Sequence, residues 1–178
     1  MADTKTRILD VAEKLTQIRG FNGFSYIDLA EEIGVKTASI HYHYKLKADL
    51  ALALVERIHE EHVGAFGQLD ARFSSPEKRL TALVEQFESY LKEEKFCLCG
   101  MLSAEMQSLS PAVKKRLKAY FDDMRSWVAK QLKELGFKDH KNRSLNFVSA
   151  LEGSLLIARL YDDPALIRDS MKLVKKAS

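Results

Sequence analysis

The chain has 178 residues, of which 46% are apolar and 30% are charged, and its formal net charge is +3. This length suffices for one large domain or for a small and a medium one, and no apolar run approaches the ~18–20 residues of a membrane-spanning helix. The N-terminus lacks the apolar segment of a secretory signal, and two cysteines are too few for a disulfide framework. We therefore expect a globular protein of the reducing cytoplasm.

Residues 4–20 predict a first amphipathic helix. Apolar side chains recur at helical spacing from Ile8 to Ile18, and a glycine stands at the predicted end of the helix. Phe21 and Phe24 lie in the turn that follows. We expect both rings to fill a small core between the first three helices.

Residues 25–50 predict two short helices joined by a tight turn at Gly34. Ser25 stands where an N-cap belongs. The inward face of the first helix is predicted to comprise Ile27, Leu29, Ala30 and Ile33. The second helix, from about Lys36 to Tyr44, carries no carboxylate, and most of its side chains are hydrogen-bonding or aromatic. Such a helix suits base edges and phosphates in a DNA major groove, so this stretch predicts a helix-turn-helix.

The charge of this region is unevenly distributed. Residues 1–50 contain seven Lys or Arg and seven Asp or Glu, so the segment as a whole is neutral. Around the second helix, however, Lys36, Lys45 and Lys47 occur without an acid. A local basic stripe of this kind is what phosphate contact requires.

Beyond residue 47 the pattern predicts six more helices. A long one starts near Lys47 and runs at least to Phe66, with Val63 in its apolar stripe. The others are expected at about 76–93, 98–108, 111–135, 141–161 and 164–175. Because no stretch shows strand-like alternation, we expect an all-α protein of about nine helices. A three-helix domain at 1–47 precedes a helical body at 48–178.

Two runs, GFNGFSYIDLAEEIGV and VKTASIHYHYKLKADL, share a wider pattern. Its matching positions are Gly20-Phe21, Ser25, Leu29-Ala30, Gly34-Val35, Ile40 to Tyr44, and Lys47 to Leu50. In this pattern the N-terminal ~50 residues resemble the TetR family of bacterial transcriptional regulators. His41 replaces the usual tyrosine, and Ala38 stands where glycine or proline is common. These departures leave the operator sequence open.

The resemblance implies an obligate homodimer with an effector pocket in the C-terminal body. It also implies that the last two helices, around Leu145–Tyr161 and Pro164–Lys175, pair with their copies in the partner. The small residues around Gly153 suit such close helix packing. A further stretch, Cys97 to Leu109, is similar to a branch of the family that includes thiol-based sensors of reactive electrophiles.

The resemblance also indicates which residues would contact DNA. Thr37, Ser39 and Tyr42 would meet bases or phosphates, although ordinary solvated side chains remain the alternative. His41 has two alternatives, a place in the groove or a partly buried position. The full predicted set is Ser25, Tyr26, Lys36, Thr37, Ser39, His41, Tyr42, His43 and Lys47. Within it, Tyr26, His43 and Lys47 are expected near phosphates, with Lys47 at a helix start that attracts anions. We assign Ile40 and Tyr44 to the core.

Seven residues are candidates for effector binding or sensing: Tyr90, Cys97, Cys99, Met101, Glu105, Tyr120 and Trp127. The two cysteines stand at a predicted helix start, which favours the thiolate, but a free cysteine is also a common small buried hydrophobe. Glu105 is either a buried carboxylate in a ligand pocket or an exposed one. The aromatic residues either line that pocket or belong to the ordinary core.

These features predict a homodimeric repressor that leaves a palindromic operator when a small molecule or a reactive electrophile acts on the body. The alternative is an all-α dimeric interaction or adaptor protein that does not bind DNA. No glycine-rich phosphate loop, nucleophile elbow or HExxH motif is present. We therefore predict no enzymatic activity, no metal site and no cofactor.

Overall fold

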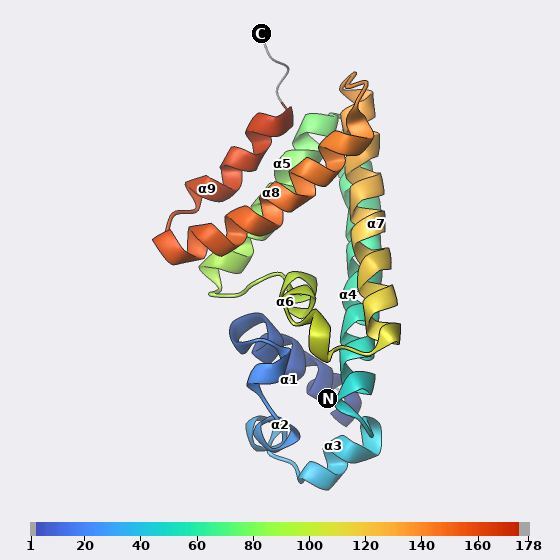
Figure 1. The fold of residues 1–178 in the computed structure, drawn as a ribbon, viewed down its shortest axis with the longest axis vertical. Coiled ribbons are helices and arrows are strands. Elements are labelled where there is room, and N and C mark those ends of the chain that lie inside the picture. Colours follow the sequence, from blue (N-terminus) through green and yellow to red (C-terminus); the bar gives the residue numbers. More distant parts are fainter. Residues whose placement is uncertain (1–2, 175–178) are drawn as a thin grey trace. The chain divides into compact units, whose positions relative to one another are not determined.

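The computed structural model describes residues 3–174, and within this range it is built from helices without a strand (Figure 1). The helices are α1 (Thr4–Arg19), η1 (Phe21–Gly23), α2 (Tyr26–Ile33), α3 (Thr37–His43), α4 (Lys47–Arg72), α5 (Pro76–Lys92), α6 (Leu98–Ala104), η2 (Met106–Ser108), α7 (Pro111–Glu134), α8 (His140–Tyr161), α9 (Ala165–Arg168) and η3 (Asp169–Val174), where η denotes a 3₁₀-helix. The predicted all-α class is confirmed. None of the described helices is both long enough and apolar enough to span a membrane.

The described chain forms two compact units. The first unit comprises residues 3–60 and 97–120, and the second comprises residues 61–96 and 121–174. Helices α4 and α7 each contribute to both units. The predicted division at residues 47 and 48 follows the end of the helix-turn-helix pattern. In the structure α6 and the beginnings of α4 and α7 group with the first three helices, and the sequence pattern contained no signal for this association.

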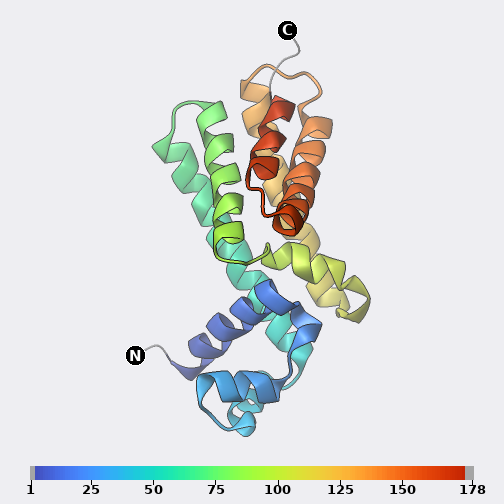
Figure 2. The ribbon, with the colours of Figure 1, turned by 90° about the vertical axis from the view of Figure 1, so that its left-hand side faces the viewer.

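Local chemistry fixes the first three helices, which we call the head (Figure 2). The Ser25 hydroxyl accepts hydrogen bonds from the backbone N–H groups of Ile27 and Asp28, and the Asp28 carboxylate accepts one from the Ser25 N–H. The Ser25 hydroxyl also donates a hydrogen bond to the Asp28 carboxylate at 2.6 Å, and this bond first, then that from the Ser25 N–H, lowers the pKa of Asp28. Gly34 ends α2 with φ of +77°, a left-handed conformation that a side chain disfavours. The predicted cap and turn are therefore confirmed.

The head has one apolar core. Its fully or nearly fully buried side chains include Ile8, Leu15, Phe21, Phe24, Leu29, Ile33, Ile40 and Tyr44. The predicted burial of both phenylalanines, of Ile40 and of Tyr44 is confirmed. Two other expectations were wrong, because Ile27 is 60% exposed and Ile18 is 36% exposed. Leu29 and Ala30 set the buried face of α2, which turns the neighbouring Ile27 outward.

Ion pairs and hydrogen bonds hold α1 to the other helices of the first unit. Arg57 of α4 binds the Asp10 carboxylate at 2.6 Å and also binds Glu13. The Arg7 guanidinium donates to the carbonyl of Ile33 at the end of α2, at 2.6 Å. The orientation of the head within its unit is thus set by specific contacts as well as by apolar packing.

In the second unit, α5 packs against α8 and against the α9–η3 segment. Val63 was predicted in the buried stripe of α4 but is 49% exposed. The last segment was predicted as a single helix to Lys175. In the structure it is a four-residue α-helix followed by a 3₁₀-helix that ends at Val174, and Lys175 lies outside the described residues. The predicted helix 98–108 is likewise divided into α6 and η2.

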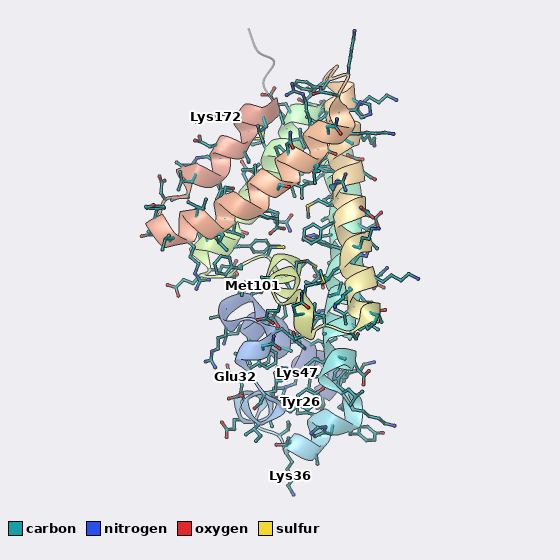
Figure 3. The ribbon with its side chains drawn as sticks, in the orientation of Figure 1. Tyr26, Glu32, Lys36, Lys47, Met101 and Lys172 are labelled. Carbon is teal, nitrogen blue, oxygen red and sulfur yellow. The ribbon has the colours of Figure 1, made fainter. Side chains whose placement is uncertain are left out.

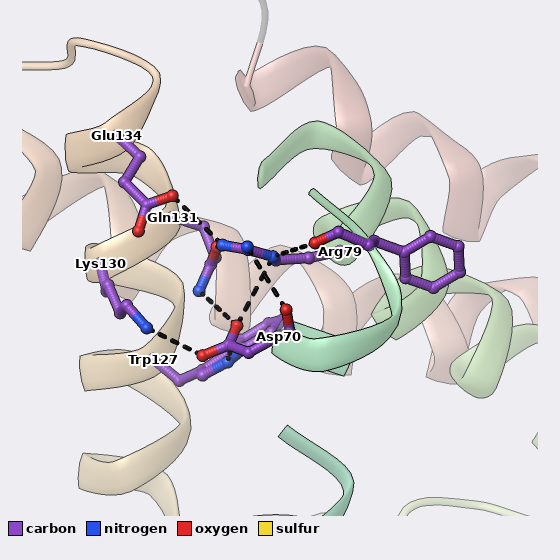
Figure 4. A network of polar contacts seen from close by, with 7 residues as sticks. Asp70, Arg79, Trp127, Lys130, Gln131 and Glu134 are labelled. Atoms are coloured by element: carbon purple, nitrogen blue, oxygen red, sulfur yellow. Dashed lines mark hydrogen bonds and ion pairs between the residues drawn. The ribbon is translucent and has the colours of Figure 1, made fainter. Parts of the chain in front are cut away.

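A polar network fixes the end of α4 to α7 within the second unit (Figure 4). The Asp70 carboxylate accepts hydrogen bonds from Trp127 at 3.1 Å, Lys130 at 2.8 Å and Gln131 at 3.3 Å. Burial alone would raise the pKa of Asp70, but Lys130, Trp127 and the Arg79 charge together hold it below its usual value. The network therefore favours an ionised Asp70 and orients the facing side of α7.

Candidate DNA-binding site and the helix that contacts it

The exposed surface of α3 is polar and carries no carboxylate. Lys36 precedes the helix, projects away from the rest of the head (Figure 3), and makes no ion pair among the described residues. Thr37, Ser39 and His43 are half-buried, and Tyr42 is 82% exposed. An exposed aromatic ring gains nothing from the core, whereas a phenol can stack on or hydrogen-bond to a ligand. This surface therefore has the donors and the charge that a nucleic acid requires.

His41 and Tyr26 form a pair beside this surface. Their rings lie 4.8 Å apart in an edge-to-face arrangement, and His41 is exposed with its Nδ1 3.4 Å from the Lys45 carbonyl. Tyr26 is only 9% exposed, its hydroxyl is buried, and this burial raises the pKa of Tyr26 to about 12. The hydroxyl is therefore not placed for the phosphate contact predicted from the sequence. The Tyr26 ring instead packs edge-to-face against the inner side of the His41 ring.

Lys47 also differs from its predicted role. Its ammonium donates hydrogen bonds to the carbonyls of Phe21, at 2.6 Å, and of Phe24. It also lies 4.7 Å and 4.5 Å from the centres of these two rings. Desolvation in this position lowers the pKa of Lys47, although the Glu105 charge opposes the shift. The structure thus places the half-buried Lys47 ammonium on the Phe21–Phe24 turn, where backbone carbonyls and two aromatic rings surround it.

The two cysteines are buried at the start of α6. Cys97 is the N-cap residue, and its sulfur accepts a hydrogen bond from the Gly100 N–H at 3.4 Å. The same sulfur lies 3.9 Å from the Tyr120 hydroxyl, and the His59 ring lies edge-on to Tyr120 with centres 5.9 Å apart. Cys97 is 2% exposed and Cys99 is fully buried. The structure therefore brings Cys97 and Tyr120 together, as a candidate sensing site would require.

The other end of α6 contacts the head directly. The Glu105 carboxylate accepts a hydrogen bond from the Asn22 N–H at 2.9 Å, and the Asn22 amide donates to the Ser108 hydroxyl at 2.9 Å. A Cβ on Gly20, where φ is +83°, would collide with the Glu105 carboxylate and would stand 3.6 Å from the Met101 methyl group. We call these interactions the α6–loop contact. Neither Asn22 nor Ser108 was predicted from the sequence.

The remaining two sensing candidates belong to the second unit. Trp127 stacks on Phe66 with ring centres 4.7 Å apart and donates its indole N–H to Asp70 (Figure 4). Tyr90 lies edge-on to Phe87 with ring centres 5.6 Å apart. Both contacts are those of ordinary packing residues. The structure therefore groups five of the seven candidates in the unit that contains the head.

Known families and solved structures that this chain resembles are described as transcriptional regulators or regulatory proteins, several of them of the TetR family. Residues 8–54 match the family described as "Bacterial regulatory proteins, tetR family", and residues 76–172 match "Transcriptional regulator LmrA/YxaF-like, C-terminal domain". A TetR transcriptional regulator from Legionella pneumophila is 31% identical, with a TM-score of 0.91 over 98% of this chain and 96% of its own. A TetR-family regulator from Agrobacterium tumefaciens is 26% identical, with a TM-score of 0.88 over 94% and 93%.

A sequence relative supports the same assignment. An HTH-type transcriptional regulator encoded in the lacX 3′ region of Lactococcus lactis is 23% identical over 98% of this chain and 93% of its own length. The two family matches together extend over both the helix-turn-helix and the C-terminal helices. The chain therefore belongs to the TetR family of bacterial regulatory proteins.

Proposed function

We propose that this transcriptional regulator is a homodimeric repressor that binds a palindromic operator through α3 and leaves it when an effector changes α6. The observation that carries this proposal is the surface of α3, which is polar, free of carboxylates and held on a rigid head. Lys36 would bind phosphate, and Thr37, Ser39 and Tyr42 would contact base edges or phosphates. With two-fold symmetry, the half-sites would lie about one helical turn, ~34–36 Å, or somewhat more apart.

Dimerisation is supported by an exposed uncharged face of α8. Leu156 is 62% exposed and Leu160 is 79% exposed, and Leu145 and Ile157 are also exposed. A Cβ at Gly153 would meet no atom within 4 Å, so the packing of the chain itself does not require a glycine there. Close approach of a second helix does require a small residue. We infer that this face of α8, with the α9–η3 segment, meets its copy in a partner chain.

Changing Leu156 to lysine should separate the dimer. In an interface with two-fold symmetry each substitution occurs twice. Removal of a central apolar anchor weakens binding by about 2 kcal/mol or more at each of the two copies, so the dimer dissociation constant should rise by about 10³-fold or more. Sedimentation velocity measures this change. Val63→Lys introduces the same charge at another exposed apolar position of the second unit. Equal masses for the Leu156 variant and the Val63 control would contradict the proposed interface.

Coupling between effector and operator is supported by the two ends of α6. Its first residues include the buried cysteines, and the turn after its last residue supplies Glu105, which binds the loop between α1 and α2. A change at Cys97, such as oxidation or alkylation, would disturb the hydrogen bonds that its sulfur makes at the helix start. Movement of α6 would then reach the head through the α6–loop contact. The head would respond by turning about the start of α4, near Lys47.

The experiment that tests operator binding is a fluorescence anisotropy titration. The dimer is titrated against DNA from upstream of its own gene, with a scrambled fragment of the same composition as control. We expect affinity for the upstream fragment to be at least about 10³-fold higher, as for other sequence-specific regulators. Equal weak binding to both fragments would favour the alternative, an adaptor protein that reads no DNA sequence.

A further inference from the structure

A groove in the second unit lies outside both the α3 surface and the cysteine site. It has a volume of about 520 Å³ and is bounded by one face of α7 and the first turns of α8. Its lining residues are Asp122, Arg125, Ser126, Ala129, Lys130 and Lys133 from α7, and His140, Lys141 and Ser144 from α8. Small side chains at 126, 129 and 144 leave the space that longer side chains would fill. The groove therefore follows from the sequence of both helices.

The lining of this groove is strongly cationic. It contains four permanently charged bases and a single carboxylate, Asp122. Asp122 lies 3.6 Å from Arg125, and the Lys130 ammonium binds Asp70 (Figure 4). Lys133 and Lys141 make no ion pair with any described residue. Like charges on facing helices repel one another, so an anion between them would stabilise the arrangement.

Two donor groups at this groove lack a partner of their own. The Nε of Arg125 is buried and makes no hydrogen bond with another described residue. Helix α8 has 22 residues, and its N-cap residue, Asp139, does not cap it, because the Asp139 carboxylate binds Arg143 at 2.8 Å instead. The first N–H groups of α8 thus receive no side-chain acceptor from the cap residue, and this helix end, whose His140 and Lys141 line the groove, carries positive potential.

We propose that this groove binds a small polyanion, a phosphate ester or a polycarboxylate, at a site distinct from the DNA-binding surface. Its volume lies within the range of small-ligand sites, roughly 300–1,000 Å³. A guanidinium from α7 and ammonium groups from α7 and α8 would bind separate oxygens of the same anion. The site consists only of residues of the second unit, and anion binding there does not depend on operator binding.

Calorimetric titration of the full-length protein with pyrophosphate and, separately, with citrate tests the site. Ionic strength is held constant with sodium chloride, since screening alone changes charge interactions. We expect saturable binding of at least one of the two anions, and at least tenfold weaker binding by Arg125→Gln and by Lys133→Gln. The two anions distinguish phosphate from carboxylate as the preferred group. Circular dichroism checks that each variant is folded.

Two lysine variants serve as controls. Lys138→Gln removes an exposed charge outside the lining, and Lys36→Gln removes one from the α3 surface. Both should bind the anion as the parent protein does. Equal binding by the groove variants, loss of binding in Lys36→Gln, or no saturable binding of either anion up to about 10 mM would each overturn the inference.

Discussion

Replacing Lys47 with alanine should lower the free energy of unfolding by about 2–4 kcal/mol, because charged hydrogen bonds and contacts with two aromatic faces are lost together. The ammonium binds the carbonyls of Phe21 and Phe24 and lies against both rings. Without it, two carbonyls in the turn lose their donor and the start of α4 loses its attachment to that turn. Thermal unfolding followed by circular dichroism measures the loss.

Lys45 supplies the control for this experiment. It is two residues away, exposed, and its side chain takes part in none of the contacts made by Lys47. Lys45→Ala should leave stability unchanged within about 0.5 kcal/mol, as for most surface substitutions. If Lys47 instead binds phosphate, Lys47→Ala would reduce the log–log salt slope of operator binding by about one with stability unchanged. That outcome would contradict the structural role assigned here.

Replacing Glu105 with alanine should uncouple α6 from the head while the protein remains folded. The hydrogen bond to the Asn22 N–H lies at the surface, so water can replace the lost acceptor and the stability cost should be small. The coupling between the effector site and the DNA-binding surface should decrease more, because linkage between two sites requires a contact that both sites influence. Coupling between ligands is typically about 5–150-fold, and we expect it to fall by at least about fivefold in this variant.

Two measurements test whether α6 is uncoupled from the head in Glu105→Ala. The first is release of operator DNA by N-ethylmaleimide, in the parent protein, in Glu105→Ala and in Cys97→Ser. The second is hydrogen exchange at the Asn22 amide, which should accelerate in Glu105→Ala whether or not the electrophile acts as an effector. Gln107→Ala, an exposed change two residues away, is the matched control. Unchanged exchange at Asn22 would contradict the coupling role of Glu105. Where the electrophile releases the parent protein from DNA, equal release of Glu105→Ala would contradict it as well.

Much of the head was predictable because its determinants are local. The cap at Ser25 and the turn at Gly34 depend on residues within a few positions of one another, and both are visible in the sequence. The uncharged face of α8 was likewise visible as a run of small and apolar residues. Periodicity failed at Ile27 and Val63, where a hydrophobic residue lies on the exposed side of its helix. In those cases residue type did not indicate side-chain direction.

The direction of long side chains was not predictable from position alone. The resemblance placed Lys47 at a helix start, where a lysine is suited to phosphate, but the two phenylalanine carbonyls that take its ammonium lie 23 and 26 residues earlier. Tyr26 similarly lies on the inner side of His41. A family pattern gives the place of a residue in the chain, while its partners depend on tertiary packing.

The partner of Glu105 was also not predictable, because the two residues lie far apart in the chain. From the sequence it had two alternatives, a pocket carboxylate or an exposed one. The structure gives it another partner, the Asn22 N–H, 83 residues earlier in the chain. No local motif could have indicated that pairing. The glycine at position 20 was predicted only as a helix end, yet it also leaves the space that the Glu105 carboxylate occupies.

We propose that two copies of α3, one from each protomer, bind a symmetric operator. Hydroxyl-radical footprinting of the DNA upstream of the protein's own gene tests it most directly. We predict two protected half-sites related by a dyad, with centres one helical turn, ~34–36 Å, or somewhat more apart. Protection should disappear in Tyr42→Ala at the same protein concentration. A single unpaired protected site, or no protection even at about 50 mM salt, where phosphate contacts are strong, would contradict the claim.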